Sequence, residues 1–108
     1  MSAKDITFAK LGDRNYPEWS RNMQALFMIK QAWGVVSGTV SPPPATQADK
    51  LEAYNTLKQM TAGLIWLALE PPQQILIQSE LGDGVKMWTQ LKQLHASNAS
   101  APARIFGL

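Results

Sequence analysis

Three clusters of proline and glycine interrupt this chain and limit the length of every regular element that it can form. Pro42-Pro43-Pro44 cannot continue a helix, Pro71-Pro72 ends another, and Gly82-Asp83-Gly84 makes a third break. Between these breaks apolar side chains recur at helical spacing, and no segment alternates convincingly as a half-buried strand does. The pattern therefore predicts an all-α fold, a small bundle of four to five helices.

The first expected helix follows a polar loop. Asn15, with Pro17 close behind it, is typical of a helix start. Trp19 and Met23 then recur at helical spacing, which predicts an amphipathic helix of about fifteen residues. Residues 32–36 are expected to form a short apolar turn, closed by a glycine.

A long helix is expected after the triple proline. Thr46 can cap it, with Asp49 as the acidic partner of a capping box. Residues 64–69 are apolar on almost every side, which places this end of the helix in the centre of the fold. Pro71-Pro72 can then form the first turn of a short third helix reaching about residue 81, although 75–77 could also be a strand.

The last third of the chain predicts two further helices. Asp83 is a good cap for a fourth helix, whose apolar stripe includes Val85 and Trp88. A polar loop is expected over residues 96–100. Ser100-Ala101-Pro102 would then start a fifth helix that the end of the sequence cuts short.

The composition excludes several classes of protein. The 108 residues suit a single domain, 1–108, of which we expect 1–7 to be flexible. The chain has no cysteine, so disulfide scaffolds, thiol catalysis and zinc sites built on thiolates are excluded. The longest apolar stretch, 62–69, is about half as long as a membrane span requires, and the N-terminus carries no signal-peptide pattern. We therefore expect a cytoplasmic protein without membrane contact.

The residues that could support catalysis are few. His95 is the only histidine, and it falls near the apolar face of the fourth helix, where packing is a commoner role than catalysis. Asp49 and Glu52 lie three residues apart at a helix start, where negative charge stabilises the helix. We therefore expect no enzyme activity, no cofactor, no metal ion and no small-molecule substrate.

Nucleic-acid binding would need a basic surface or stacking aromatic side chains. The formal net charge is only +2, and the ten basic residues are spread along the chain without forming a run. Trp19, Trp66 and Trp88 lie within apolar helical stripes, which favours a core position over base stacking. The position of Trp33, in the short apolar turn, is left open.

The first helix carries more apolar side chains than one core can accept. Phe27, Met28 and Ile29 are consecutive, so they cannot all face the core together with Trp19 and Met23. Part of this surface should meet another helix or another chain. We take Phe27, Met28 and Ile29 as the candidate interaction surface.

The order of these features resembles a known family. Residues 11–19 match the pattern Leu-Gly-x-x-Asn-Tyr-x-x-Trp, and three further segments follow it: the Ala-Trp-Gly-Val-Val-Ser-Gly run at 32–38, the apolar run at 65–69, and Val85-x-x-Trp88-x-x-Leu91. From about Phe8 to Phe106 the chain resembles the Gag polypeptide of Ty1/copia-type LTR retrotransposons. The resemblance implies a helical, retroviral-capsid-like N-terminal domain with a structural rather than enzymatic role.

The resemblance also implies which residues and partners matter. The motif and core anchors are Tyr16, Trp19, Met23, Trp33, Trp66 and Trp88. The implied activity is Gag–Gag self-association into cytoplasmic virus-like particles that enclose RNA. Tyr54 stands where the family often has tryptophan. Family members continue past the position of Phe106 into further helices and often a Cys/His zinc knuckle, so we expect this chain to match the N-terminal part of a capsid region. RNA contact is then expected to be weak or indirect.

Two other functions remain open at this point. A domesticated Gag-derived adaptor would bind a partner peptide in a groove between helices. A weak RNA chaperone would bind through the modest positive charge, with a strong dependence on salt.

Overall fold

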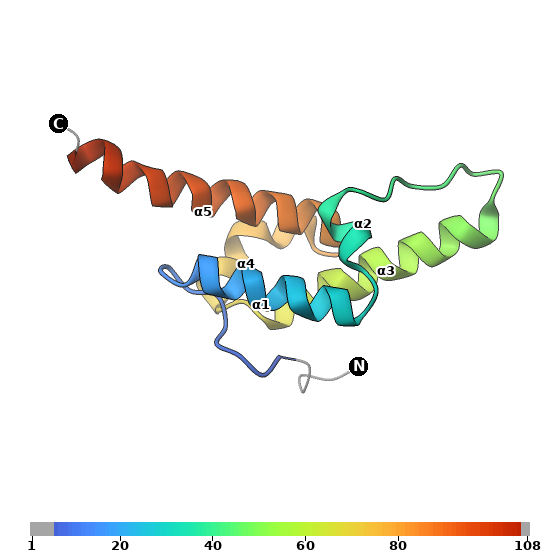
Figure 1. Ribbon diagram of the computed structural model, residues 1–108, viewed down its shortest axis with the longest axis horizontal. Coiled ribbons are helices and arrows are strands. Elements are labelled where there is room, and N and C mark those ends of the chain that lie inside the picture. Colours follow the sequence, from blue (N-terminus) through green and yellow to red (C-terminus); the bar gives the residue numbers. More distant parts are fainter. Residues whose placement is uncertain (1–5, 107–108) are drawn as a thin grey trace.

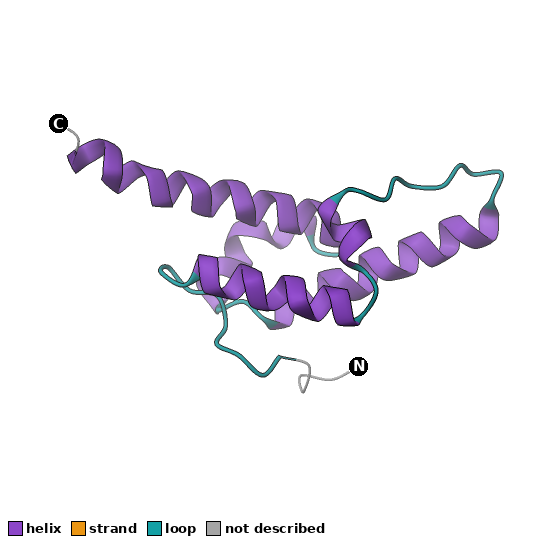
Figure 2. Cartoon of the chain, viewed as in Figure 1, coloured by secondary structure: helices purple, strands orange, loops and turns teal. Residues whose placement is uncertain are grey.

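The protein is described by a computed structural model over residues 6–106, with side chains described over residues 6–96. The described residues form five α-helices and one short 3₁₀-helix: α1 (Tyr16–Ile29), α2 (Trp33–Ser37), α3 (Ala48–Leu67), α4 (Pro71–Ile77), η2 (Gln78–Glu80) and α5 (Gly84–Phe106). No strand forms within the described part of the chain (Figure 2). The prediction of a small all-α bundle is therefore confirmed, and residues 75–77 are helical.

The helices form an elongated body of 55 × 30 × 24 Å. Helix α3 packs against α5, and α2 contacts both of them. In Figure 1 the C-terminal part of α5 extends beyond one end of the body, and the N-terminal part of α3 extends beyond the other. The loop after α2 runs out to the far end of α3.

One core fills the space between the helices. Buried apolar side chains come from all five helices and from the loops beside them: Leu11, Trp19, Met23, Leu26, Phe27, Val36, Ala62, Leu64, Ile65, Ala68, Leu69, Ile77, Met87, Trp88 and Leu91. Residues 64 and 65, in the nearly all-apolar end of α3, are completely buried, as the sequence predicts. Of the segment expected to be flexible, residues 1–5 lie outside the described residues, and Ile6 packs against this core.

The loop before α1 is closed by Asn15. The helix begins at Tyr16 with Pro17 in its first turn, as predicted, but the Asn15 side chain does not cap it. Instead Oδ1 of Asn15 accepts a hydrogen bond from the backbone N of Gly12 (2.8 Å), and its Nδ2 donates to the backbone O of Lys10 (2.9 Å). The asparagine therefore stabilises the loop rather than the helix end.

The expected capping box of α3 is wrong. The helix starts at Ala48 with Gln47 at the N-cap position, and no side chain caps it. The backbone N of Gln47 donates to the O of Pro44 (2.9 Å), so the chain turns just before the helix. This turn places Thr46 one residue too early to reach the first free N–H groups of the helix.

Two further boundaries differ from the expectation. Residues 33–37, within the expected apolar turn, form the short helix α2, which ends at Gly38 with a φ of 86°. The expected loop over 96–100 is helical, so the fourth and fifth expected helices are one continuous helix, α5. Extending an existing helix gains one hydrogen bond per residue, and alanine, which recurs at 96, 99 and 101, is the best helix former.

The loop before α1 is joined to the end of α3 by backbone contacts. The N of Leu11 donates to the O of Ala68 (2.8 Å), and the N of Glu70 donates to the O of Leu11 (3.1 Å). The O of Ala68 also accepts a hydrogen bond from the indole Nε1 of Trp19 (2.9 Å). The carbonyl of Ala68 therefore connects both the loop and α1 to the end of α3.

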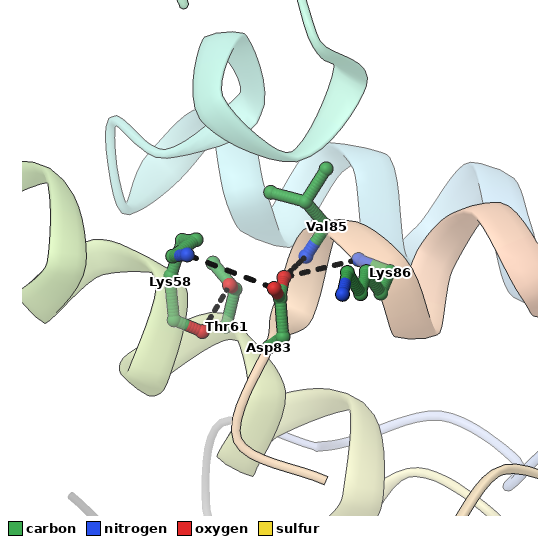
Figure 3. A network of polar contacts seen from close by, with 5 residues as sticks. All are labelled: Lys58, Thr61, Asp83, Val85 and Lys86. Atoms are coloured by element: carbon green, nitrogen blue, oxygen red, sulfur yellow. Dashed lines mark hydrogen bonds and ion pairs between the residues drawn. The ribbon is translucent and has the colours of Figure 1, made fainter. Parts of the chain in front are cut away.

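The start of α5 is stabilised by Asp83, as predicted (Figure 3). Its Oδ1 accepts hydrogen bonds from the backbone N of Val85 and of Lys86, both at 3.1 Å. Its Oδ2 lies 3.6 Å from Nζ of Lys58 on α3. Both side chains of this ion pair are partly exposed, so the cap should contribute more to stability than the charge pair.

A cap prediction follows from this geometry. Asp83→Ala should lower the free energy of unfolding by about 1 kcal/mol, because two N–H groups lose their acceptor. Asp83→Asn keeps an acceptor and removes the charge, so its loss should be only a few tenths. Urea unfolding of the two variants measures the difference. Equal losses in both would show that the ion pair, and not the cap, carries the effect.

Candidate interaction surface

The consecutive residues of the candidate surface lie on different sides of α1. Met28 is 59% exposed and Ile29 is 77% exposed, whereas Phe27 is completely buried. The assignment of Phe27 to an interaction surface is therefore wrong. Each helical residue is rotated by about 100° from the one before it, so Phe27 follows Met23 into the core while Met28 and Ile29 turn outward.

Trp88 of α5 is the centre of an aromatic cluster in the core. Its ring stacks on Trp19 at 5.9 Å between centroids, and it meets Phe27 and Trp33 edge to face, both at 5.7 Å. The cluster joins α1, α2 and α5. Aromatic pairs in these geometries contribute about 0.5–1.5 kcal/mol each beyond the area that they bury.

The motif anchors differ in how deeply they are buried. Trp19, Met23 and Trp88 lie in the core, while Tyr16, Trp33 and Trp66 are half-buried and pack against it. All six side chains contact the core and none extends into solvent as a stacking platform would. Trp33, whose position the sequence left open, covers the edge of Trp88.

A second exposed apolar surface lies on α4 and the segment after it. Ile75 is 66% exposed, Leu76 is 51% exposed and Leu81 is 53% exposed. Sequence reasoning placed this segment in a helix but did not assign it to a surface. The signal was available, because three consecutive helical residues span about 200° and cannot all face the protein core, and here only Ile77 does.

A chain of polar side chains runs from the buried His95 to the exposed Asp13, where the loop before α1, α4 and α5 meet. Nε2 of His95 is 2.8 Å from Oε1 of Gln73. Nε2 of Gln73 donates to Oδ1 of Asp13 at 3.4 Å. The imidazole ring also stacks on Tyr16, with 4.9 Å between centroids. We call these four residues, Asp13, Tyr16, Gln73 and His95, the histidine cluster.

The protons of the histidine cluster can be assigned from its acceptors. A carboxylate only accepts, so the Gln73 amide directs its NH₂ toward Asp13 and its oxygen toward His95. Nε2 of His95 must then carry a proton. Burial lowers the pKa of His95, against a smaller upward effect of the Asp13 carboxylate, and burial raises the pKa of Tyr16.

A small cleft opens beside this cluster. It has a volume of about 130 Å³ and is lined by Gly12, Asp13, Glu70, Pro72 and Gln73. Its walls combine two carboxylates with an amide that already has hydrogen-bond partners on both sides. Over the described residues no group of three or more His, Asp or Glu side chains could hold a metal ion.

No helix within the described residues combines the length and the apolar character that crossing a bilayer requires. The most apolar helix end, that of α3, lies in the protein core instead.

Comparison with known proteins returns no match for this chain: no protein-family model, no curated protein and no solved structure is similar at a significant level.

Proposed function

We propose that this protein is a structural domain of the Gag type, which associates with copies of itself through exposed apolar helical surfaces and so contributes to a virus-like particle. The resemblance of residues 11–19 to the Gag motif suggests the class of protein. The observation that carries the proposal is the exposure of five large apolar side chains beside a core that is already complete: Met28, Ile29, Ile75, Leu76 and Leu81.

Exposed apolar side chains in clusters are what protein contacts require. Residues Ile75 and Leu76 are neighbours on α4, and the exposed residues that follow them, Gln78 and Ser79, are uncharged. Depletion of charge around apolar side chains is typical of the centre of an interface. Met28 and Ile29 form a second exposed apolar pair at the C-terminal end of α1, next to Lys30.

The small size of each apolar pair suits assembly better than a permanent dimer. A stable dimer buries roughly 800 Å² on each partner, with a large apolar centre. Two or three side chains support only a weak contact. When each copy carries two such surfaces, many weak contacts add up across an assembly.

Association is tested with one charge placed on each surface. Ile29→Glu and Ile75→Glu should each reduce concentration-dependent association by tenfold or more, roughly the effect of losing about 1.4 kcal/mol at an interface. Both side chains are mostly exposed, so folding should be kept. The matched control is Gln93→Glu, which adds the same charge at an exposed polar position of α5. Sedimentation velocity over a concentration series measures the result.

Sedimentation of the wild-type protein, together with RNA-binding and peptide-binding measurements, separates the alternatives. A wild-type protein that stays monomeric at every concentration would contradict the proposal. RNA binding at low salt that falls steeply with added salt would favour the chaperone. A monomer that binds a partner peptide, with affinity lost in Ile75→Glu, would favour the adaptor.

A further inference from the structure

His95 connects three elements that are far apart in the sequence. It lies on α5, hydrogen-bonds Gln73 on α4, and stacks on Tyr16 at the start of α1. Through Gln73 it also reaches Asp13 in the loop before α1. The side chain is 5% exposed, so these contacts are made inside the protein.

The contacts of His95 are made by its neutral ring, which is buried. Its hydrogen bond to Gln73 is already made by the neutral ring, so this contact does not need a second proton. One face of the ring is covered by Tyr16. A buried imidazolium without a direct carboxylate partner is costly, because burial removes its water and no counter-charge replaces it.

Within the histidine cluster, His95 is the group whose charge changes near neutral pH. From the loop before α1 the charged group is the carboxylate of Asp13, separated from the ring by the Gln73 amide. From α1 the titratable group is the phenol of Tyr16, which stays neutral because burial raises its pKa further. From α4 the group is the uncharged Gln73.

We propose that His95 is a pH-sensitive latch: its neutral ring holds α4 and the loop before α1 against α5, and its protonation releases them. The sign follows from the direction of the pKa, which is lower in the closed state than the usual value of about 6.5. The opened state then takes up the proton first. The latch is most stable above about pH 6.5, and this stability is lost progressively as the pH falls from that value toward the lower pKa of the closed state.

The latch is a property separate from self-association, but helix α4 takes part in both. Helix α4 carries Ile75 and Leu76, so opening would change how this apolar surface is presented. That link rests on the proposed function. The latch itself can be measured in dilute, monomeric protein, so it can fail or hold whether or not the chain assembles.

The first test is the titration of His95 by NMR in the wild-type protein. Because the chain has one histidine, a single imidazole signal reports it without ambiguity. The midpoint is expected below about 6.5. A midpoint at or above that value would overturn the proposal.

The second test is amide hydrogen exchange at pH 7.5 and pH 5.5, expressed as protection factors so that intrinsic exchange cancels. The amides of Leu11 and of 73–77 are expected to lose protection at pH 5.5, while those around residues 61–65 of α3 keep it. In His95→Gln, which cannot be protonated, the selective loss should disappear. A loss spread evenly over all helices, or one that persists in His95→Gln, would overturn the latch.

A third test uses a second variant to show whether the charge on His95, and not its packing alone, controls the latch. Asp13 is exposed, and asparagine can still accept the hydrogen bond from Gln73, so Asp13→Asn should fold normally. Removing the carboxylate removes the effect that raises the pKa of His95. The His95 midpoint should therefore move to lower pH. The loss of protection at pH 5.5 should be at least as large as in the wild type, because the gap between the closed-state and opened-state pKa values widens. An unchanged midpoint would contradict the charge arrangement on which the latch depends.

Discussion

Replacing Trp19 by alanine is expected to lower the free energy of unfolding by about 3–5 kcal/mol, which approaches the whole stability of many small domains. The side chain is 1% exposed, stacks on Trp88 and donates to the carbonyl of Ala68. Its removal leaves a cavity between α1 and α5 and breaks the hydrogen bond from α1 to the carbonyl of Ala68, at the end of α3. Thermal unfolding followed by circular dichroism should show a midpoint at least about 12 °C lower.

Two matched variants separate the contributions of Trp19. Trp19→Phe keeps an aromatic ring in the cluster but cannot donate to Ala68, so it should lose less than Trp19→Ala. Trp66→Ala removes a tryptophan that is only half-buried, and it should also lose less. A Trp19→Ala protein that unfolds at the wild-type temperature would show that the aromatic cluster does not hold the fold together.

Replacing Gly84 by alanine is the second change with a large expected effect. In a helix interior alanine is favoured over glycine by about 1 kcal/mol, and at Gly84, the first residue of α5, propensity still favours alanine, by less than that. However, a Cβ at this position would overlap Oγ1 of Thr61 and lie 2.9 Å from the backbone N of Ala62. Because backbone atoms cannot move aside cheaply, α3 and α5 must separate at the place where they pack. We expect a loss of about 3 kcal/mol or more, the upper part of the range for overpacked cores.

The double variant Gly84→Ala/Thr61→Ala tests the cause of this loss. It removes the overlapping hydroxyl of Thr61 but leaves the close approach to Ala62, so it should recover only part of the stability. Urea unfolding of the single and double variants measures the recovery. A Gly84→Ala protein as stable as the wild type would show that the two helices are not packed this closely.

Helix ends were predictable where the signal was local. Pro71-Pro72 begins α4 and Asp83 caps α5, because a missing N–H or a carboxylate acts on backbone groups within one turn. The loop over 96–100 was mispredicted since its polar residues are also compatible with a helix that has already formed. Thr46 failed as a cap because a turn one residue later sets the start of α3.

The candidate surface was only partly predictable. The run from Phe27 to Ile29 correctly indicated more apolar side chains than the core can take, but the run alone does not say which of them is buried. Helical rotation with the buried residues Trp19 and Met23 as reference decides it. The exposed pair on α4 was missed although the same reasoning applies to residues 75–77.

The sequence by itself determined that this protein is a helical bundle, where most of its helices begin, and that Trp19 and Trp88 belong to the core. These properties depend on contacts within a few residues, which the order of side chains records directly. Only the tertiary structure decided that Gly84 meets Thr61, that Phe27 faces Trp88, and that His95 bonds Gln73. Those partners lie more than twenty residues apart in the sequence, so they come into contact only when the helices pack. A local sequence pattern therefore cannot predict these contacts.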